Sequence, residues 1–206
     1  MLAGLCSCQV TTQPKDLGAL DWIPEQASRL EPNSNVLQLE SLHFTSTPTA
    51  EHLQSLQQLK HLRSLEIWDE GCFRAPTYEV GRLDDATLKE ISKLDRLETL
   101  AIAGWASAYS DRGLKPVINM PHLKRLKLNM APLITDRAML EIAKMRSLTH
   151  LDITYTTITD VGLSHLMAAP QLQSVAYGWT QTQTNHAHRF LETHPDSTFL
   201  IGFESP

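Results

Sequence analysis

"LTHLDITYTTITDVGLSHLMAAPQ", residues 148–171, changes its apolar period part-way along. From Leu148 to Ile153 apolar and polar residues alternate, as on a half-buried strand whose successive side chains point to opposite faces. The later residues have the three-to-four-residue spacing of one helix face, at Val161, Leu163, Leu166 and Met167. A strand, a turn and a helix of this size cannot bury their own apolar face, so the stretch must pack against similar units.

Such units recur along the chain through the strand pattern L-x-x-L-x-L, with aliphatic substitutes. Clear copies lie at Leu62-Leu65-Ile67, Leu97-Leu100-Ile102, Leu123-Leu126-Leu128 and Leu148-Leu151-Ile153. Weaker copies lie at Leu172-Val175-Tyr177, Ser34-Leu37-Leu39 and Thr198-Ile201-Phe203. All steps between successive copies but one fall within the period of roughly 20–29 residues that is typical of leucine-rich solenoids. The exception is the longer step from Leu62 to Leu97.

The segment "ITDRAMLEIAKMRSLTHLDITYTTITDVGLSHLMAAPQL" resembles leucine-rich repeat proteins whose units read L-x-x-L-x-L-x-x-T-x-I-T-D-x-G-L-x-x-L. This subclass is similar to the repeat portions of F-box-type adaptors and of many bacterial repeat proteins. The resemblance covers roughly residues 34–197 and is strongest over 123–171, whereas Gly104-Trp105 and Gly178-Trp179 depart from the usual Asn, Cys or Thr. It implies an α/β solenoid of about six to seven repeats, with parallel strands on the concave face and helices on the convex face.

Four aspartates at equivalent positions are expected to cap the helices: Asp85, Asp111, Asp136 and Asp160. Each precedes the next leading leucine by the same interval, from 85 to 97, 111 to 123, 136 to 148 and 160 to 172. The interval from a leading leucine to the following aspartate varies instead, and it is longest from 62 to 85 and shortest from 148 to 160. Length therefore varies only between strand and helix. In repeat proteins, insertions confined to one edge often mark the binding face.

Composition favours a soluble globular chain that forms one elongated array. The 206 residues are 42% hydrophobic and 20% charged, with a net charge of −5 and a pI near 6.0. This charge argues against a nucleic-acid partner, and no apolar run is long enough to span a membrane. We expect a monomer.

The two ends are expected to differ from the repeats at 34–197. Residues 1–14, "MLAGLCSCQVTTQP", resemble the end of a bacterial lipoprotein signal with Cys8 as the lipid acceptor, although no Lys or Arg precedes the box. The alternative is a disordered terminus with incidental cysteines; the first reading implies the cell envelope and the second the cytoplasm. Residues 15–33 are predicted to form an N-terminal cap with Pro24 in the first turn of a helix, and 198–206 a C-terminal strand.

A binding surface is predicted on the concave face, where residues between the buried leucines point outward. The candidates on the strands are Glu66, Trp68, Arg125, Lys127, Asn129, His150 and Asp152, followed by Thr154. Tyr155 and Trp179 lie at the following turns, and Trp105 and Tyr109 lie in the insertion at 104–110. Exposed Trp and Tyr beside Arg and Asp are typical of interface hot spots. The alternative is that Trp68 and Trp179 pack locally over neighbouring strands.

No catalytic or metal site is predicted. The longest insertion, "WDEGCFRAPTYEVGR" at 68–82, contains Cys72 beside acids but no histidine that could serve as its base, so Cys72 is expected to be an apolar filler. His186, His188 and His194 lack a Cys or carboxylate at zinc-ligand spacing, which predicts a polar last helix. We therefore expect no enzyme and no cofactor.

Two functions remain open on the sequence. The first is a non-catalytic module that binds a protein or peptide through the concave strands and the edge loops. The alternative is an envelope-anchored lipoprotein that binds carbohydrate or peptidoglycan, with Trp68, Trp105 and Trp179 stacking on sugar rings.

Overall fold

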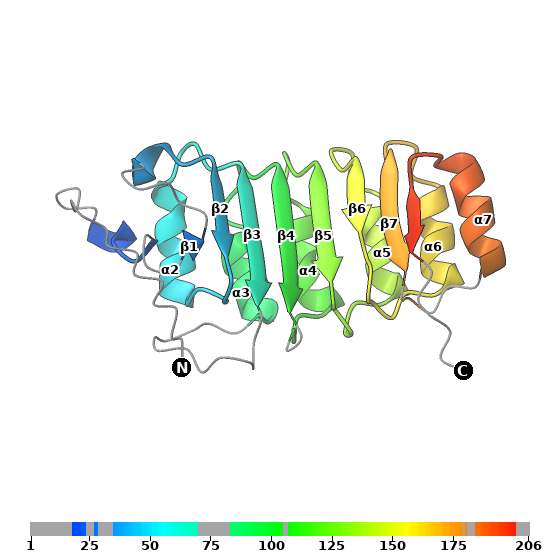
Figure 1. The fold of residues 1–206 in the computed structure, drawn as a ribbon, viewed down its shortest axis with the longest axis horizontal. Coiled ribbons are helices and arrows are strands. Elements are labelled where there is room, and N and C mark those ends of the chain that lie inside the picture. Colours follow the sequence, from blue (N-terminus) through cyan, green and yellow to red (C-terminus); the bar gives the residue numbers. More distant parts are fainter. Residues whose placement is uncertain are drawn as a thin grey trace, which may run out of the picture.

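The computed structural model describes residues 18–23, 27–28, 35–69, 83–104, 107–178, 180 and 184–200. Strand and helix alternate along most of this length (Figure 1). The strands are β1 (Ala27–Ser28), β2 (Ser41–Phe44), β3 (Ser64–Asp69), β4 (Thr99–Gly104), β5 (Arg125–Asn129), β6 (His150–Asp152), β7 (Ser174–Gly178) and β8 (Thr198–Leu200). The α-helices are α2 (Ala50–Ser55), α3 (Asp85–Ile91), α4 (Asp111–Ile118), α5 (Asp136–Ile142), α6 (Asp160–Met167) and α7 (Thr184–Thr193). Three short 3₁₀ helices are η1 (Gly18–Leu20), η2 (Val36–Gln38) and η3 (Leu56–Gln58).

The strands form one sheet in which spatial order follows chain order, from β1 to β8. Neighbours from β2 to β8 pair in parallel, whereas β1 pairs antiparallel with β2. Six strand–helix units, from β2–α2 to β7–α7, therefore stack side by side. A parallel neighbour requires a crossover connection, which here is the helix of each unit.

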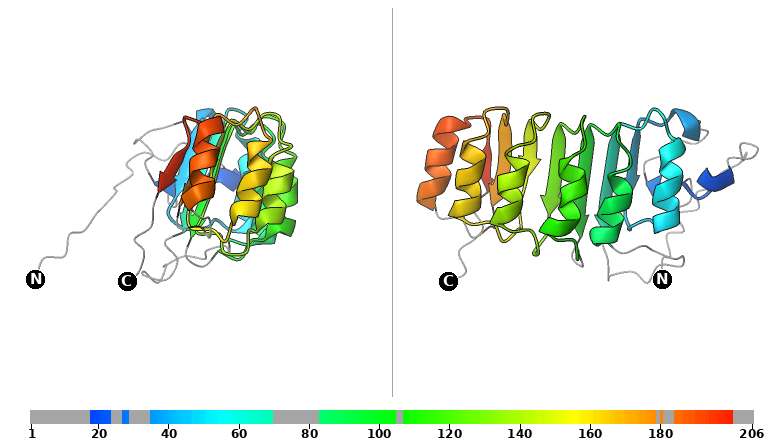
Figure 2. Two further views of the ribbon diagram at one scale, coloured as in Figure 1. Left: turned by 90° about the vertical axis from the view of Figure 1, so that its right-hand side faces the viewer. Right: turned by 180° about the vertical axis from the view of Figure 1, so that it is seen from behind.

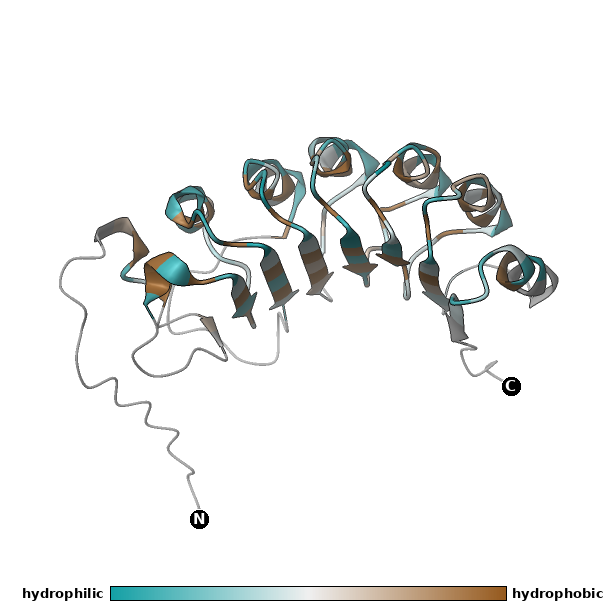
Figure 3. Cartoon of the chain, turned by 90° about the horizontal axis from the view of Figure 1, so that it is seen from above, coloured by the Kyte–Doolittle hydropathy of each residue, from teal (hydrophilic) through white to brown (hydrophobic). Residues whose placement is uncertain are grey.

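The helices cover only one face of the sheet. The right-hand view of Figure 2, seen from behind, shows the helices side by side in front of the strands. Figure 3 shows the strands along the inner side of an arc and the helices along its outer side. The concave face thus consists of strands that no helix of the described chain covers. This confirms the predicted α/β solenoid with about six repeats.

The core lies between the two layers and consists of the repeated leucines. Parallel registration places Leu65, Leu100, Leu126 and Leu151 in one row, with Val175 continuing it. All five side chains are buried. Each unit contributes about three such residues, and full burial of one Leu or Val contributes roughly 1.5–3 kcal/mol. The stack is therefore stabilised mainly by contacts between adjacent units.

The first and last units have a different register from the predicted one. Leu42 and Phe44 pair with Leu65 and Ile67, so the first copy begins at Leu39 rather than Ser34. The predicted second residue, Leu37, lies in η2 and is exposed. At the other end Ala176 pairs with Thr198, so the last copy starts four residues earlier than predicted.

The last unit has polar residues where the other units have leucine. These polar residues make a hydrogen bond and a stacking contact inside the protein. Val175 and Ser197 occupy equivalent rows, and the Val175 N–H donates to Ser197 Oγ at 3.0 Å. His194 takes the leading position, is buried, and stacks on Phe190 with ring centroids 4.4 Å apart. These groups close the end of the core. Because they are not leucines, the leucine pattern placed the last copy four residues too late.

The helix caps lie one residue before the predicted aspartates. Asp84, Ser110, Thr135 and Thr159 are the N-cap residues, and their side chains accept backbone N–H groups of the first turn. The predicted capping residues instead occupy the first helical position. Their carboxylates still favour the positive end of the helix dipole.

Three of these aspartates link adjacent units. Asp85 accepts hydrogen bonds from the N–H and hydroxyl of Ser110, the cap of the next helix, and Asp136 does the same for Thr159. Asp111 makes the equivalent pair with Thr135. Ser110, Thr135 and Thr159 are therefore each held by the preceding unit while they cap their own helix.

The glycine of the ITDxGL pattern makes room for this link. A Cβ on Gly162 would clash with the Asp136 carboxylate and would stand 2.8 Å from Ile158 Cγ2. A Cβ on Gly113 would clash with Asp85 in the same way. The equivalent residue of α5 is Ala138, and α5 packs less closely on α4 than α4 does on α3 or α6 on α5. The small residue thus sets the helix spacing.

The first unit is covered on its N-terminal side by residues from the predicted cap. Trp22 stacks on Phe44 and His52, with centroids 5.4 and 4.2 Å apart, and its Nε1–H donates to Ser55 Oγ at 3.0 Å. Leu20 and Ile23 are buried beside it. Ala27–Ser28 form strand β1, so no helix runs through these two residues. Pro24 itself and residues 1–17 lie outside the described residues.

Candidate binding surface

Strand pairing arranges the outward-pointing residues of the concave face in rows. One row contains Ser64, Thr99, Arg125, His150 and Ser174. The next contains Glu66, Ala101, Lys127, Asp152 and Ala176. A third contains Trp68, Ala103 and Asn129. The predicted strand residues are thus brought together on one surface, with strands about 4.8 Å apart.

Trp68 is the large aromatic residue of the third row. Its side chain is 40% exposed, although the two residues that flank it on β3, Ile67 and Asp69, are buried and half-buried. Glu66, on the same face, is half-buried. An indole with this much exposure, on a sheet face that no described helix covers, offers apolar area and one N–H donor to a partner. Trp68 therefore remains a candidate contact residue for a partner.

Arg125 and Lys127 form the cationic part of the face. Both side chains are exposed and project from β5 on the same side. In the part of the chain that the structure describes, neither makes an ion pair with a carboxylate. Lys124, just before the strand, is different, because its Nζ lies 2.7 Å from Glu98. Lys124 donates a hydrogen bond to Glu98 and attracts its charge, which holds the pKa of Glu98 below its ordinary value of 4.5.

The prediction that Asn129 is an exposed contact residue is wrong, because Asn129 is buried and only 9% of its surface is accessible. Its Nδ2 donates to Asp152 Oδ1 at 2.9 Å and to the buried Thr154 Oγ1. The same Asp152 oxygen also accepts the N–H and hydroxyl of Thr154, at 3.1 and 2.9 Å. These three residues therefore hold the ends of β5 and β6 together, and Asp152 has one carboxylate oxygen committed to that role.

Two non-glycine residues adopt a left-handed backbone just after these strands. Met130 has φ 56° and Tyr155 has φ 58°, and they occupy equivalent positions of consecutive units. This conformation costs about 1–2 kcal/mol for a residue with a Cβ. Tyr155 nevertheless keeps its side chain 41% exposed, beside the concave edge. Residues in such sparsely populated backbone conformations cluster at functional sites.

The prediction that Tyr109 is an exposed residue of the binding surface is wrong. Its side chain is fully buried, and burial raises the pKa of its hydroxyl well above the usual value of 10. The hydroxyl has no hydrogen-bond partner within the described ranges. The sequence suggested exposure because Tyr109 lies in an insertion, but it is the residue just before the Ser110 cap and packs into the core. The remaining predicted residues Trp105, Trp179, Cys72 and Cys8 lie outside the described residues.

His150 has a local partner on the face. Its Nδ1 lies 2.8 Å from the Thr149 hydroxyl, which in turn donates to the Lys124 carbonyl at 3.1 Å. His194 is buried against Phe190, and no group of three or more potential metal ligands occurs among the described residues. The side chains of His186 and His188 lie outside this description. No helix in the described ranges has the length and apolarity required to cross a membrane.

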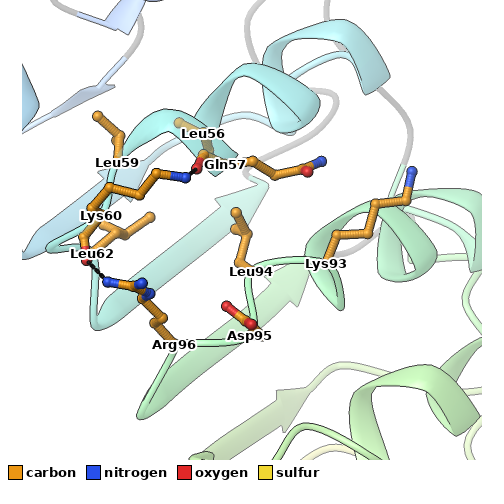
Figure 4. A pocket seen from close by; sticks show the side chains of 9 residues that line it. All are labelled: Leu56, Gln57, Leu59, Lys60, Leu62, Lys93, Leu94, Asp95 and Arg96. Carbon is orange, nitrogen blue, oxygen red and sulfur yellow. Dashed lines mark hydrogen bonds between the residues drawn. The ribbon is translucent and has the colours of Figure 1, made fainter.

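A small pocket lies at the opposite edge, where the chain turns from helix to strand (Figure 4). Its volume is about 130 Å³, below the roughly 300–1,000 Å³ of typical ligand sites. Lys60 Nζ donates to the Gln57 carbonyl at 2.9 Å, and the Arg96 guanidinium donates to the Lys60 carbonyl at 3.1 Å. These cations are committed to turn carbonyls, so the pocket reflects packing between units rather than a binding site.

Comparison with known proteins agrees with this architecture. A family model described as a leucine-rich repeat matches residues 144–167, the stretch that contains β6 and α6. The fold is a leucine-rich repeat solenoid. Comparison with curated proteins found no match. The finer assignment to the ITDxGL subclass remains a prediction from the sequence.

Two solved structures from Listeria monocytogenes are similar to this leucine-rich repeat chain. Internalin C2 has 16% sequence identity and a TM-score of 0.45, over 79% of this chain and 80% of that one. The internalin inlF has 15% identity and a TM-score of 0.49, over 80% of this chain and 48% of that one. This chain therefore spans about half of the inlF chain. The strand register and the family match, not these superpositions, identify the repeat.

Proposed function

We propose that the protein is a non-catalytic interaction module that binds a protein or peptide through its concave sheet. Leucine-rich repeat folds are typical protein–protein interaction scaffolds. The observation that supports the proposal most directly is a sheet face that no described helix covers and that carries exposed Trp68, Arg125 and Lys127. Trp and Arg are the residue types that most often dominate binding energy at interfaces.

The size of the face favours a peptide segment as the ligand. Seven parallel strands at a spacing of about 4.8 Å give a surface about 29 Å long. Strands of about five residues give it a width of about 17 Å. The resulting area of about 500 Å² is less than the roughly 800 Å² that each partner of a standard globular complex buries. An extended segment fits this face, whereas a larger partner must also contact the edge loops.

The alternative of an envelope-anchored carbohydrate binder has less support. It depends on Trp68, Trp105 and Trp179 together, and of these only Trp68 lies within the described residues. Its lipid anchor depends on Cys8, which also lies outside them. Aromatic rings suit both sugars and proteins, so Trp68 alone does not favour this function. Peptidoglycan is therefore used as the competing ligand in the test.

The test is a capture experiment followed by reconstitution. The full chain, its Trp68→Ala/Arg125→Glu double variant and the convex control Arg112→Glu/Leu140→Ala are immobilised, and captured proteins are then purified and measured by calorimetry. We expect the concave variant to weaken the Kd by about 100-fold or more, since each hot-spot residue contributes roughly 2 kcal/mol. The convex control should change it less than threefold. Equal loss in both variants, or retention on peptidoglycan alone, would overturn the proposal.

A further inference from the structure

Strand β5 carries more positive charge toward the concave side than any of its described neighbours. Within four residues the chain reads Lys-Arg-Leu-Lys, from Lys124 to Lys127. The leucine, Leu126, is buried in the core, while the three cations are exposed. On β4 the corresponding rows carry Thr99 and Ala101, neither of which is charged. Arg125 and Lys127 therefore face no carboxylate from β4.

Local acids neutralise only part of this charge. Glu98 pairs with Lys124 at 2.7 Å and lies 3.9 Å from Arg63, so its charge is already shared between two cations. Glu66 lies two strands from Lys127, about 10 Å away, which is close to the screening length at physiological salt. Asp152 is in register with Lys127, but no ion pair forms and one of its oxygens binds Asn129 and Thr154. Arg125 and Lys127 remain available.

The spacing of these two cations defines what can bind them. Arg125 and Lys127 are two residues apart on a strand, so their Cα atoms are about 6.6 Å apart and their side chains leave the same face. An extended peptide has the same repeat, and its residues i and i+2 also share a face. Guanidinium and ammonium groups both bind carboxylates, the guanidinium in a bidentate manner. The matching motif is a pair of carboxylates at i and i+2.

We infer that β5 is the recognition strand for an acidic, extended segment of a partner protein, with Arg125 and Lys127 each binding one carboxylate of an acid-x-acid motif. The inference rests on the proposed function and names the chemistry of its ligand. Because the chain as a whole has a net charge of −5, this strand is a local exception that orients an acidic ligand on the concave face.

The experiment uses a phage-displayed library of random dodecapeptides as the probe. The full chain is the target, and phage that also bind the Arg125→Ala/Lys127→Ala variant are removed. In a parallel selection, phage that bind the Arg112→Ala/Lys115→Ala variant of the convex face are removed instead. This variant is a control with the same loss of charge. We expect the first selection to enrich Asp or Glu at i and i+2. The second should remove such peptides, because the convex variant keeps the cations of β5 and still binds them.

Selected peptides are then synthesised and measured by fluorescence anisotropy. Raising the salt from about 50 to about 500 mM should weaken binding about fivefold or more. Replacing both acidic residues of the peptide with Gln should also weaken binding about fivefold or more. Glu98→Gln frees Lys124 from its ion pair, so it should tighten binding about threefold.

The outcomes separate this inference from the proposed function. A third selection on the intact chain is made without subtraction. If it yields Trp68-dependent peptides that lack paired acids, the acidic motif is overturned and the interaction module stands. Peptides that bind the convex control as weakly as the concave variant would overturn the assignment of β5. If no peptide is enriched on the intact chain, the inference about β5 fails, while the capture experiment decides the proposed function separately.

Discussion

The carboxylate of Asp136 holds Thr159, the residue that caps the next helix. Asp136 Oδ1 accepts the Thr159 N–H at 2.8 Å, and Oδ2 accepts the Thr159 hydroxyl at 2.6 Å. Thr159 Oγ1 in turn accepts the Val161 N–H at 3.2 Å. One carboxylate thus fixes the start of α6 from α5, at the edge where each strand leaves the concave face.

Removing this carboxylate should destabilise the stack. Asp136→Ala loses two charge-assisted hydrogen bonds and leaves the Thr159 N–H unpaired. We expect a loss of about 1.5–3 kcal/mol in the free energy of unfolding, a range that allows for the partial exposure of the site. Urea denaturation followed by circular dichroism measures it. The exposed turn variant Asp95→Ala should change stability by less than about 0.5 kcal/mol.

Gly162→Ala should destabilise the protein, although the same change stabilises an ordinary exposed helix by about 1 kcal/mol. The added methyl group would clash with the Asp136 carboxylate and crowd Ile158. We expect a loss of about 1–3 kcal/mol. In a double-mutant cycle with Asp136→Ala, the cost of the methyl group should fall by at least about 1 kcal/mol. Additive effects would show that the carboxylate does not set the spacing.

Much of the fold could be predicted because the apolar period is local information. The rows through Leu65, Leu100, Leu126 and Leu151 lie where the leucine pattern placed them. The registers of the end units could not be found this way. Phe44 replaces the expected aliphatic residue at one end, and His194 and Ser197 replace leucines at the other, where stacking and a hydrogen bond satisfy the polar groups.

The binding surface was less predictable, since alternation along a strand gives the direction of a side chain but not its exposure. Arg125 and Lys127 are exposed as expected. Asn129 has the same orientation but is buried by its hydrogen bonds to Asp152 and Thr154, which lie on another unit. Tyr109 is buried because an insertion next to a helix cap can turn inward. Both outcomes depend on contacts between units, which no single repeat encodes.

The left-handed backbone at Tyr155 predicts an unusual response to glycine. Tyr155→Gly removes the cost of the positive φ, about 1–2 kcal/mol, but loses side-chain contacts and adds chain entropy of about 0.5–1 kcal/mol. We expect the free energy of unfolding to stay within about 1 kcal/mol of the wild type, with weaker binding to any ligand that reaches this edge. Calorimetric unfolding tests the first part. A loss above about 2 kcal/mol would mean that the aromatic ring is a packing residue.

The Glu98–Lys124 pair predicts a small pH effect of defined sign. Because the pKa of Glu98 is lowered in the folded state, its contribution is fully present above 4.5 and is lost as the pH falls through the folded value. Glu98→Gln should therefore lower the Tm slightly at pH 7, and this difference should shrink as the pH falls below 4.5. Since the pair is exposed, salt at about 0.5 M should also remove the difference at pH 7. A difference that grows as the pH falls below 4.5 would contradict the assignment.

Trp68→Ala tests whether the indole belongs to the surface rather than to the core. Its 40% exposure predicts a Tm change of less than about 2 °C. A matched core change, Ile67→Ala on the same strand, should cost about 2–5 kcal/mol. Differential scanning calorimetry of both variants makes the comparison. If Trp68→Ala is as costly as Ile67→Ala, the indole is structural and its role in binding is excluded.

The central claim is that a protein or peptide ligand binds the concave sheet. The most direct measurement is the Kd of the reconstituted ligand for the full chain and for the Trp68→Ala/Arg125→Glu variant, with folding of both checked by circular dichroism. We expect both chains to be folded and the variant to bind about 100-fold more weakly. An unchanged Kd in the folded variant would contradict a binding site on the concave face.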